Sequence, residues 1–244
     1  DNRFVFQRKI GQGAEGIVYV AVPTRNSDGG SSGLARQHRE PVAVKVVTGH
    51  AFERCRATRY LWPSLVHSNV VYPRSSYFDN ANGQCFIDME LLSSDPLEDI
   101  VSKGTLEDSR ASEVAGFLAS ALDHLRQQGV AHCDVKLENV FLWDGTVQLG
   151  DLRGIAHIRH SISSAAATVA GPSSATTTQK APELLGSTLY APPESVREGG
   201  LGSERGTKRR DLLAGDMWAL GVTLYSAVAG CHPWEVANKR VLVA

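Results

Sequence analysis

The sequence changes character near Leu97, and this change limits the possible folds more than any other feature. Before it, β-branched and aromatic residues alternate with polar ones, which predicts strands. We expect five strands, over residues 4–10, 17–22, 41–47, 70–78 and 85–91. After it, apolar residues at helical spacing from Val114 to Leu125 predict a helix with one buried face, which Gly129 is placed to stop. The expected fold class is therefore α+β, with a small β-rich part followed by a larger helical part.

Shorter signals organise the rest of the chain. The pair Asp144 and Gly145 lies between apolar runs at 139–142 and 146–149, which predicts a hairpin. An apolar stretch at 217–230 is shorter than the roughly 20 residues that span a bilayer, so it predicts a buried helix and no membrane-spanning segment. Three stretches rich in small and polar residues are expected as exposed loops, at 24–40, 158–186 and 198–211.

Composition excludes several classes of protein. The 244 residues are 42% hydrophobic and 21% charged, which is typical of a globular chain and not of a disordered or collagen-like one. Lys and Arg number 25 against 26 Asp and Glu, so no net positive charge attracts nucleic acid. The cysteines are far apart in sequence without a C-x-x-C pair, which favours free, mostly buried thiols over a metal site: Cys55, Cys85, Cys133 and Cys231.

A glycine pattern near the start indicates phosphate binding. Gly11, Gly13 and Gly16 form G-x-G-x-x-G, which dinucleotide-binding folds also use. Such a fold needs the glycines to open a helix, whereas residues 17–22 continue as a strand. We therefore expect a flap between two strands, whose glycines approach phosphate oxygens closely. Lys45 lies downstream in an apolar strand; its two interpretations are an edge lysine reaching solvent and a partner of an anion.

Residues 132–139 read His-Cys-Asp-Val-Lys-Leu-Glu-Asn and lie between the expected helix and hairpin. With the glycine pattern and Lys45 before it, this segment resembles the catalytic loop of a eukaryotic-type protein kinase. The resemblance implies a two-lobed fold, with an N-lobe and hinge over residues 1–92 and a partial, mostly helical C-lobe over residues 93–244. It also implies an ATP-dependent serine/threonine protein kinase that uses Mg²⁺ and phosphorylates a protein hydroxyl.

The resemblance assigns roles to single residues. Asp134 matches the aspartate that accepts the proton of the substrate hydroxyl, and Lys136 matches the lysine on the transferred phosphate. Lys45 matches the lysine on the α and β phosphates, while Asn139 and Asp151 match the two Mg²⁺ ligands. The other expected nucleotide contacts lie in the flap, the strands and the hinge: Gly11, Gln12, Gly13, Gly16, Val18, Ala43, Glu90, Leu92 and Phe141.

The chain also departs from the family pattern. An activation segment is expected over residues 151–194, and within it Leu152 and Arg153 replace the phenylalanine and glycine of the D-F-G motif. Cys133 replaces an arginine that binds a phosphorylated activation loop in this family, which predicts activity independent of such phosphorylation. Glu53 is the candidate ion-pair partner of Lys45, although alignment favours Thr58 for that position.

These departures support a second hypothesis, a pseudokinase that binds nucleotide or a partner without turnover. A small-molecule phosphotransferase is disfavoured by Lys136 and by the Pro-Pro-Glu sequence at 192–194, which resemble parts of a protein-substrate groove. Because the chain ends soon after the 217–230 helix, we expect the last C-lobe helices to be absent, that helix to be uncovered and the 244 residues alone to be poorly stable. The sequence leaves the location open between cytoplasmic and secreted by a parasite. The second follows from a weaker resemblance to the rhoptry kinases of coccidian parasites, carried by the long loops, the Leu-Gly-Asp run at 149–151 and the segment 190–194.

Overall fold

The computed structural model describes residues 3–13, 16–24, 40–143, 145–152, 155–157, 188–193 and 212–234. The chain divides into two compact units, a first unit of residues 1–66 and 71–93 and a second unit of residues 67–70 and 94–244. The division after Ser93 falls one residue beyond the predicted lobe boundary. The three expected loops lie outside the described residues, except for Thr24 and Glu40 at the ends of the first.

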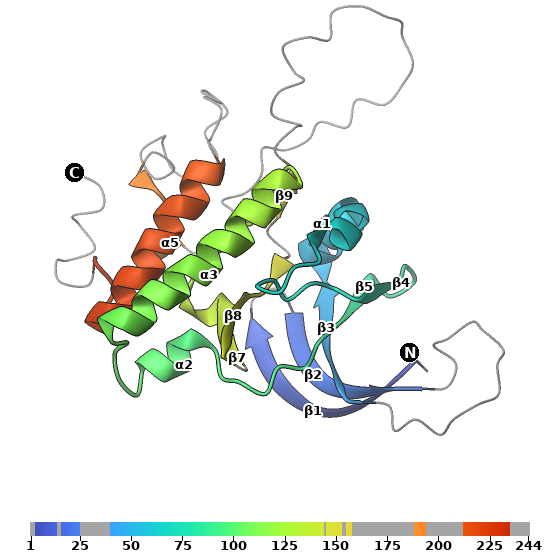
Figure 1. Ribbon diagram of the computed structural model, residues 1–244. Helices are drawn as coiled ribbons and strands as arrows, with labels where there is room; N and C mark the ends of the chain where they lie inside the picture. Colours follow the sequence, from blue (N-terminus) through green and yellow to red (C-terminus); the bar gives the residue numbers. More distant parts are fainter. Residues whose placement is uncertain are drawn as a thin grey trace, which may run out of the picture. The chain divides into compact units, whose positions relative to one another are not determined.

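The first unit contains a five-stranded antiparallel sheet (Figure 1). Its strands, in the order β1-β2-β3-β5-β4, are β1 (Phe4–Gly13), β2 (Gly16–Pro23), β3 (Val42–Thr48), β5 (Gln84–Met89) and β4 (Ser75–Asp79). The prediction of a strand over 70–78 was wrong at its start. Pro73 has no N–H for a ladder, and Val70 instead forms an isolated bridge with Leu149 of the second unit.

Strand alternation separates the two faces of this sheet. One face carries an apolar cluster, formed by Phe4, Ala21, Val42, Val44 and Phe86 with Val46 and Tyr77 beside it. On the other face, Val18 pairs with Lys45, and Ala43 precedes Lys45 by two residues on β3. Helix α1 (Gly49–Thr58) packs against β3 and β5, and a 3-10 helix, η2 (Arg59–Leu65), follows it.

In the second unit, helices α3 (Asp108–Gln127) and α5 (Leu212–Ala229) run side by side (Figure 1). Helix α3 extends beyond the predicted 114–125 segment at both ends, and it buries the predicted face, including Val114, Leu118 and Leu125. Gly129, two residues after the helix, has a φ of 74°. This left-handed conformation favours glycine and terminates the helix, as predicted. The shorter helix α2 (Leu97–Val101) packs against α5.

Short strands complete the second unit. Strands β7 (Val140–Trp143) and β8 (Thr146–Leu149) form the predicted hairpin, with Gly145 at a φ of 71° in its turn. Asn139, predicted to open the first strand, instead ends the 3-10 helix η3 (Leu137–Asn139), because its side chain turns back to the preceding loop. Strand β6 (Val130–Ala131) pairs with β9 (Ala156–His157). Leu149 also donates its N–H to the Asn69 carbonyl at 2.8 Å.

Helix α5 is long and apolar enough to cross a membrane by length and composition. It lies against α3, however, and 39% of the stretch is buried. Its Asp216 is 4% exposed and bonds to the 132–139 loop, as expected of an internal helix of a folded domain. The prediction that 217–230 is buried is only partly correct, since one side is exposed, at Met217, Trp218, Tyr225 and Val228.

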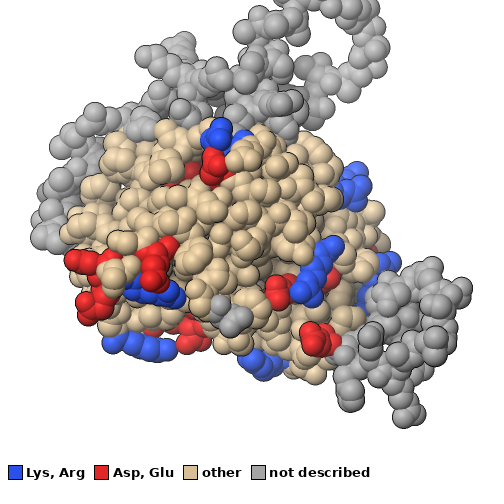
Figure 2. Space-filling model, in the orientation of Figure 1, with Lys and Arg blue, Asp and Glu red and all other residues tan. Residues whose placement is uncertain are grey.

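Charged side chains of both signs are interspersed on the face that Figure 2 displays. This agrees with the net charge of −1.

Candidate active site

A buried carboxylate holds the backbone of the 132–139 loop. Asp216 of α5 accepts the N–H groups of His132 and Cys133, both at 2.7 Å. Cys133 has a φ of 65°, a left-handed conformation that residues other than glycine seldom adopt, and the two hydrogen bonds hold it there. Burial raises the pKa of Asp216, while the neighbouring His132 and the two donated hydrogen bonds act in the opposite direction.

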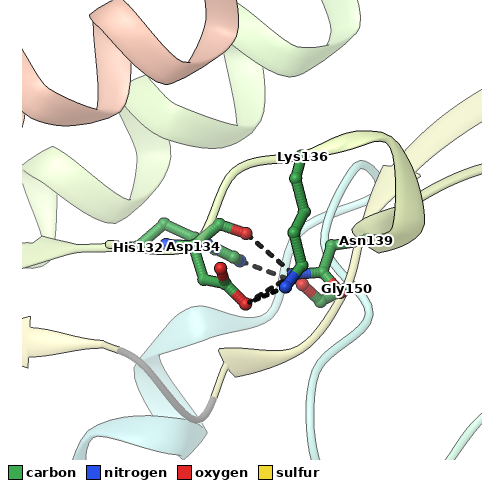
Figure 3. Close-up of polar contacts among 5 residues, drawn as sticks. All are labelled: His132, Asp134, Lys136, Asn139 and Gly150. Carbon is green, nitrogen blue, oxygen red and sulfur yellow. Dashed lines mark hydrogen bonds and ion pairs between the residues drawn. The ribbon is translucent and has the colours of Figure 1, made fainter. Parts of the chain in front are cut away.

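His132 connects this loop to the residue before Asp151 (Figure 3). Its Nδ1 accepts the N–H of Asp134 at 3.2 Å, so the ring proton lies on Nε2. Nε2 donates it to the carbonyl oxygen of Gly150 at 2.9 Å. Because the His132 side chain is fully buried, these contacts form a fixed link between the two segments.

Two donors converge on one oxygen of Asp134 (Figure 3). The Asn139 amide nitrogen donates to the Asp134 carbonyl at 2.7 Å and to Oδ2 of its carboxylate at 3.0 Å. Lys136 Nζ lies 3.0 Å from the same Oδ2. The side chains of Asp134 and Lys136 are only 14% and 17% exposed, so the carboxylate is held in one orientation. The three residues predicted from the loop therefore lie in direct contact.

The same network brings the two predicted metal ligands near each other. Asn139 uses its amide nitrogen on Asp134, so its carbonyl Oδ1 is the atom suited to a cation. Gly150 donates its N–H to the Asn139 backbone oxygen at 2.8 Å, and Asp151 follows directly with a φ of 65°. An amide oxygen and a carboxylate are the hard ligands that Mg²⁺ prefers. Leu152 is 5% exposed, as expected of an apolar plug, and Arg153 lies outside the described residues.

The first unit presents a second group of predicted residues. Val18, Ala43 and Lys45 share one face of the sheet, and Lys45 is 9% exposed. A Cβ on Gly16 would lie 2.4 Å from the Val46 carbonyl oxygen, so the close approach of β2 and β3 requires glycine there. Other predicted nucleotide contacts lie on β1 or after β5, namely Gly11, Gln12, Gly13, Glu90 and Leu92, while Phe141 lies on β7 of the second unit.

Comparison with known proteins identifies the family. Residues 4–243 match the protein kinase domain. The chain belongs to the protein kinase family. It is 30% identical to serine/threonine-protein kinase PKZ1 of Phytophthora infestans over 243 residues, which cover 93% of this chain and 54% of that protein. It is 27% identical to CBL-interacting protein kinase 31 of Oryza sativa subsp. japonica, covering 97% of this chain and 46% of that protein.

Serine/threonine-protein kinase SSK22 of Saccharomyces cerevisiae is 26% identical, with 93% of this chain and 16% of that protein covered. The chain therefore spans about half or less of the length of these curated relatives. Protein kinases in general use ATP and Mg²⁺.

The prediction for α1 concerns the ion-pair partner of Lys45. The Glu53 side chain is 66% exposed, and its carboxylate lies 4.0 Å from Arg56. Thr58, which alignment favours, ends α1 and donates its hydroxyl to the Arg54 carbonyl at 2.9 Å; a hydroxyl cannot form an ion pair. The pairing of Glu53 with Lys45 stays a prediction.

The sequence did not predict several contacts between residues 188–190 and residues 232–234. The Tyr190 ring meets His232 edge-on with centroids 5.2 Å apart. Trp234 stacks on Trp218 and donates its Nε1–H to the Leu189 carbonyl at 2.9 Å. Burial, reinforced by Glu138, raises the pKa of Tyr190 to about 12. These contacts attach η7 (Thr188–Tyr190), which lies within the predicted activation segment, to α5; Glu194 lies outside the described residues.

Asn69 is a further residue that sequence reasoning missed. Its side-chain amide donates to the Val147 carbonyl at 2.9 Å and to the Thr146 hydroxyl at 3.1 Å. It is 5% exposed, and it attaches residues 67–70 to β8. The sequence shows only an asparagine in a short polar turn, and asparagine is common in turns for local reasons that require no distant partner.

Proposed function

We propose that this domain is an ATP-dependent serine/threonine protein kinase that transfers the γ-phosphate of ATP to a hydroxyl of a protein substrate. One observation carries the proposal: Asn139 and Lys136 both contact Oδ2 of Asp134. This arrangement orients a carboxylate before substrate arrives, which is how an enzyme lowers the cost of positioning.

Each residue of the loop then has a chemical task. With two donors on Oδ2, we assign Oδ1 of Asp134 to accept the proton of the attacking hydroxyl. The Lys136 ammonium, 3.0 Å from Asp134, supplies positive charge next to the transferred phosphoryl group. Asp216 and His132 keep the loop backbone in place through hydrogen bonds of 2.7 to 3.2 Å.

The residues present fit the metal and the nucleotide that protein kinases use. Asn139 Oδ1 and the Asp151 carboxylate would hold Mg²⁺, which neutralises phosphate charge when bound. Lys45 and the glycines of β1 and β2 would bind the phosphates of ATP. Val18 and Ala43 would contact the adenine, with the residues that follow β5 and with Phe141. Support for a serine/threonine rather than a tyrosine kinase comes from Lys136 and from the names of the relatives.

A second candidate is a pseudokinase, which binds nucleotide or a protein partner without useful turnover. Arg153 favours it, because a side chain stands where the D-F-G motif of the family has a glycine. Cys133 also removes the arginine through which many kinases respond to phosphorylation.

The two candidates are separated by phosphate transfer from labelled ATP. The full-length gene product is given Mg²⁺, labelled ATP and a generic protein substrate, beside Asp134→Asn and a matched control, Asp123→Asn. Asp123 is an exposed carboxylate on α3 that pairs with Arg126. We expect Asp134→Asn to lose about a hundredfold or more of the incorporation and Asp123→Asn to keep it.

Equal incorporation by the unmodified protein and Asp134→Asn would contradict the kinase proposal. A rise in Tm with nucleotide but no incorporation would support the pseudokinase.

A further inference from the structure

One face of α1 and η2 packs on the β4–β5 pair in the first unit. Phe52, Cys55 and Arg59 follow each other at helical spacing along this face. The Phe52 ring lies 5.7 Å from the Phe78 ring, and the Arg59 guanidinium carbon lies 5.0 Å from the Phe78 ring centroid. Phe78 pairs directly with Cys85 across the two strands. Cys55, between Phe52 and Arg59, is therefore placed over Cys85.

The two thiols meet in the core of this unit. Cys55 is 1% exposed and Cys85 is fully buried, and both are free thiols. Their side chains are hydrogen-bonded to each other. That hydrogen bond and burial raise the pKa of Cys85, while the charge of Arg59 acts in the opposite direction. Two cysteines far apart in sequence are thus brought together by the packing of a helix on a sheet.

We propose that Cys55 and Cys85 form a reversible disulfide in the presence of a peroxide, which joins α1 covalently to β5. One thiol loses its proton, and the thiolate attacks an oxygen of hydrogen peroxide. The O–O bond breaks, a sulfenic acid forms, and the departing hydroxide takes up the proton and leaves as water. The second thiol displaces the sulfenic oxygen as water, and the S–S bond forms. Two thiols and one hydrogen peroxide give one disulfide and two waters.

The position of this bond gives it a defined effect. Helix α1 begins one residue after β3, and Ile87 on β5 pairs with Lys45 on β3. A bond between Cys55 and Cys85 therefore fixes α1 beside the strands that carry the predicted ATP lysine. Because both thiols are buried and the pKa of Cys85 is raised, the reaction is slow and requires transient opening of α1, and it accelerates as pH rises.

The test uses the full-length gene product treated with hydrogen peroxide, then alkylated and cleaved after glutamate. Cleavage after Glu53 and Glu90 releases residues 54–90, a peptide that contains Cys55 and Cys85 and no other cysteine. We expect this peptide to be lighter by two hydrogen atoms and to resist alkylation until a dithiol reductant is added. We also expect Tm to rise by roughly 5 °C and to return on reduction, because the bond closes a loop of the unfolded chain.

Two variants assign the effect. Cys231→Ser removes a half-buried thiol outside the first unit and should keep both the linked peptide and the Tm shift. Cys55→Ala should lose the Tm shift. Full alkylation of both cysteines after peroxide would overturn the proposal, as would a Tm shift that persists in folded Cys55→Ala. The mass of the 54–90 peptide is measured on the unmodified protein, so it tests the proposal even if Cys55→Ala does not fold.

Discussion

The two units position their functional side chains by different means. In the first unit, Val18, Ala43 and Lys45 share a face because neighbouring strands pair in register and side chains alternate. In the second unit, Asp134 is held through Asp216, whose hydrogen bond to His132 joins residues 84 positions apart. Strand register follows from local patterns, whereas the 132–139 loop depends on buried polar contacts from distant segments. We therefore expect an added side-chain atom to destabilise the first unit, and the loss of a buried polar group to destabilise the second.

Asp216→Ala should have the largest effect, because it removes the acceptor for two backbone amides of the 132–139 loop. The left-handed backbone at Cys133 loses its support as well. We expect a loss of about 3 kcal/mol or more in the free energy of unfolding, together with loss of phosphate transfer. Denaturant unfolding measures the first and labelled ATP the second.

Asp95→Ala is the matched control, since Asp95 is 63% exposed and its ion pair with Lys103 lies on the surface. It should change the free energy of unfolding by no more than about 0.5 kcal/mol. If the two variants were equally stable, the buried carboxylate would not be what supports the loop.

Gly16→Ala tests the first unit, where we expect an intermediate effect. The new Cβ would meet the Val46 carbonyl oxygen, a backbone atom that cannot move aside without disturbing β3. Overpacking of this kind costs about 1–3 kcal/mol. Gly13→Ala is the control, because nothing lies within 4 Å of its Cβ position, and its Tm should stay near that of the unmodified protein. Equal Tm values for both variants would show that close strand approach does not set the glycine requirement.

The smallest expected effect is on pH dependence, and it arises in the second unit. His67 stacks on His124 with centroids 4.8 Å apart. Burial, followed by the neighbouring His124, lowers the pKa of His67 below its ordinary value of 6.5. As pH falls below 6.5, the unfolded chain binds a proton that the folded chain resists, so the free energy of unfolding falls until the lower folded pKa is passed.

Denaturant unfolding over this pH range measures the effect. His67→Gln should flatten the fall in stability, whereas His50→Gln, on the exposed side of α1, should keep it. A pH profile that is unchanged in His67→Gln would assign the fall to other groups.

Local signals predicted much of the fold. The hairpin around Gly145 and the end of α3 before Gly129 were predicted because a left-handed turn selects glycine within a few residues. The start of β4 was predicted wrongly, because Val70 and Val71 resemble strand residues. In the structure, Val70 forms a bridge with Leu149 instead. The two bridged residues, 70 and 149, are 149 − 70 = 79 positions apart, so no local sequence pattern predicts the bridge.

The candidate site shows the same division. The order of Lys45, Asp134, Lys136 and Asn139 along the chain was enough to assign the kinase family and the expected chemistry. The convergence of two donors on one oxygen of Asp134 required the loop backbone to fold back on itself. The contact between Cys55 and Cys85 required a helix to pack on a strand pair.

Strand alternation and turn positions could be predicted from the residues alone, because they depend on interactions within a few residues. Which polar groups are buried together became visible only in the folded chain, because burial depends on segments that are distant in sequence. Asp216 illustrates the difference: its place in an apolar helix is visible in the sequence, and the fold makes it the acceptor that holds the 132–139 loop. The physical reason is that a buried polar group must find its partner wherever the packed chain places one.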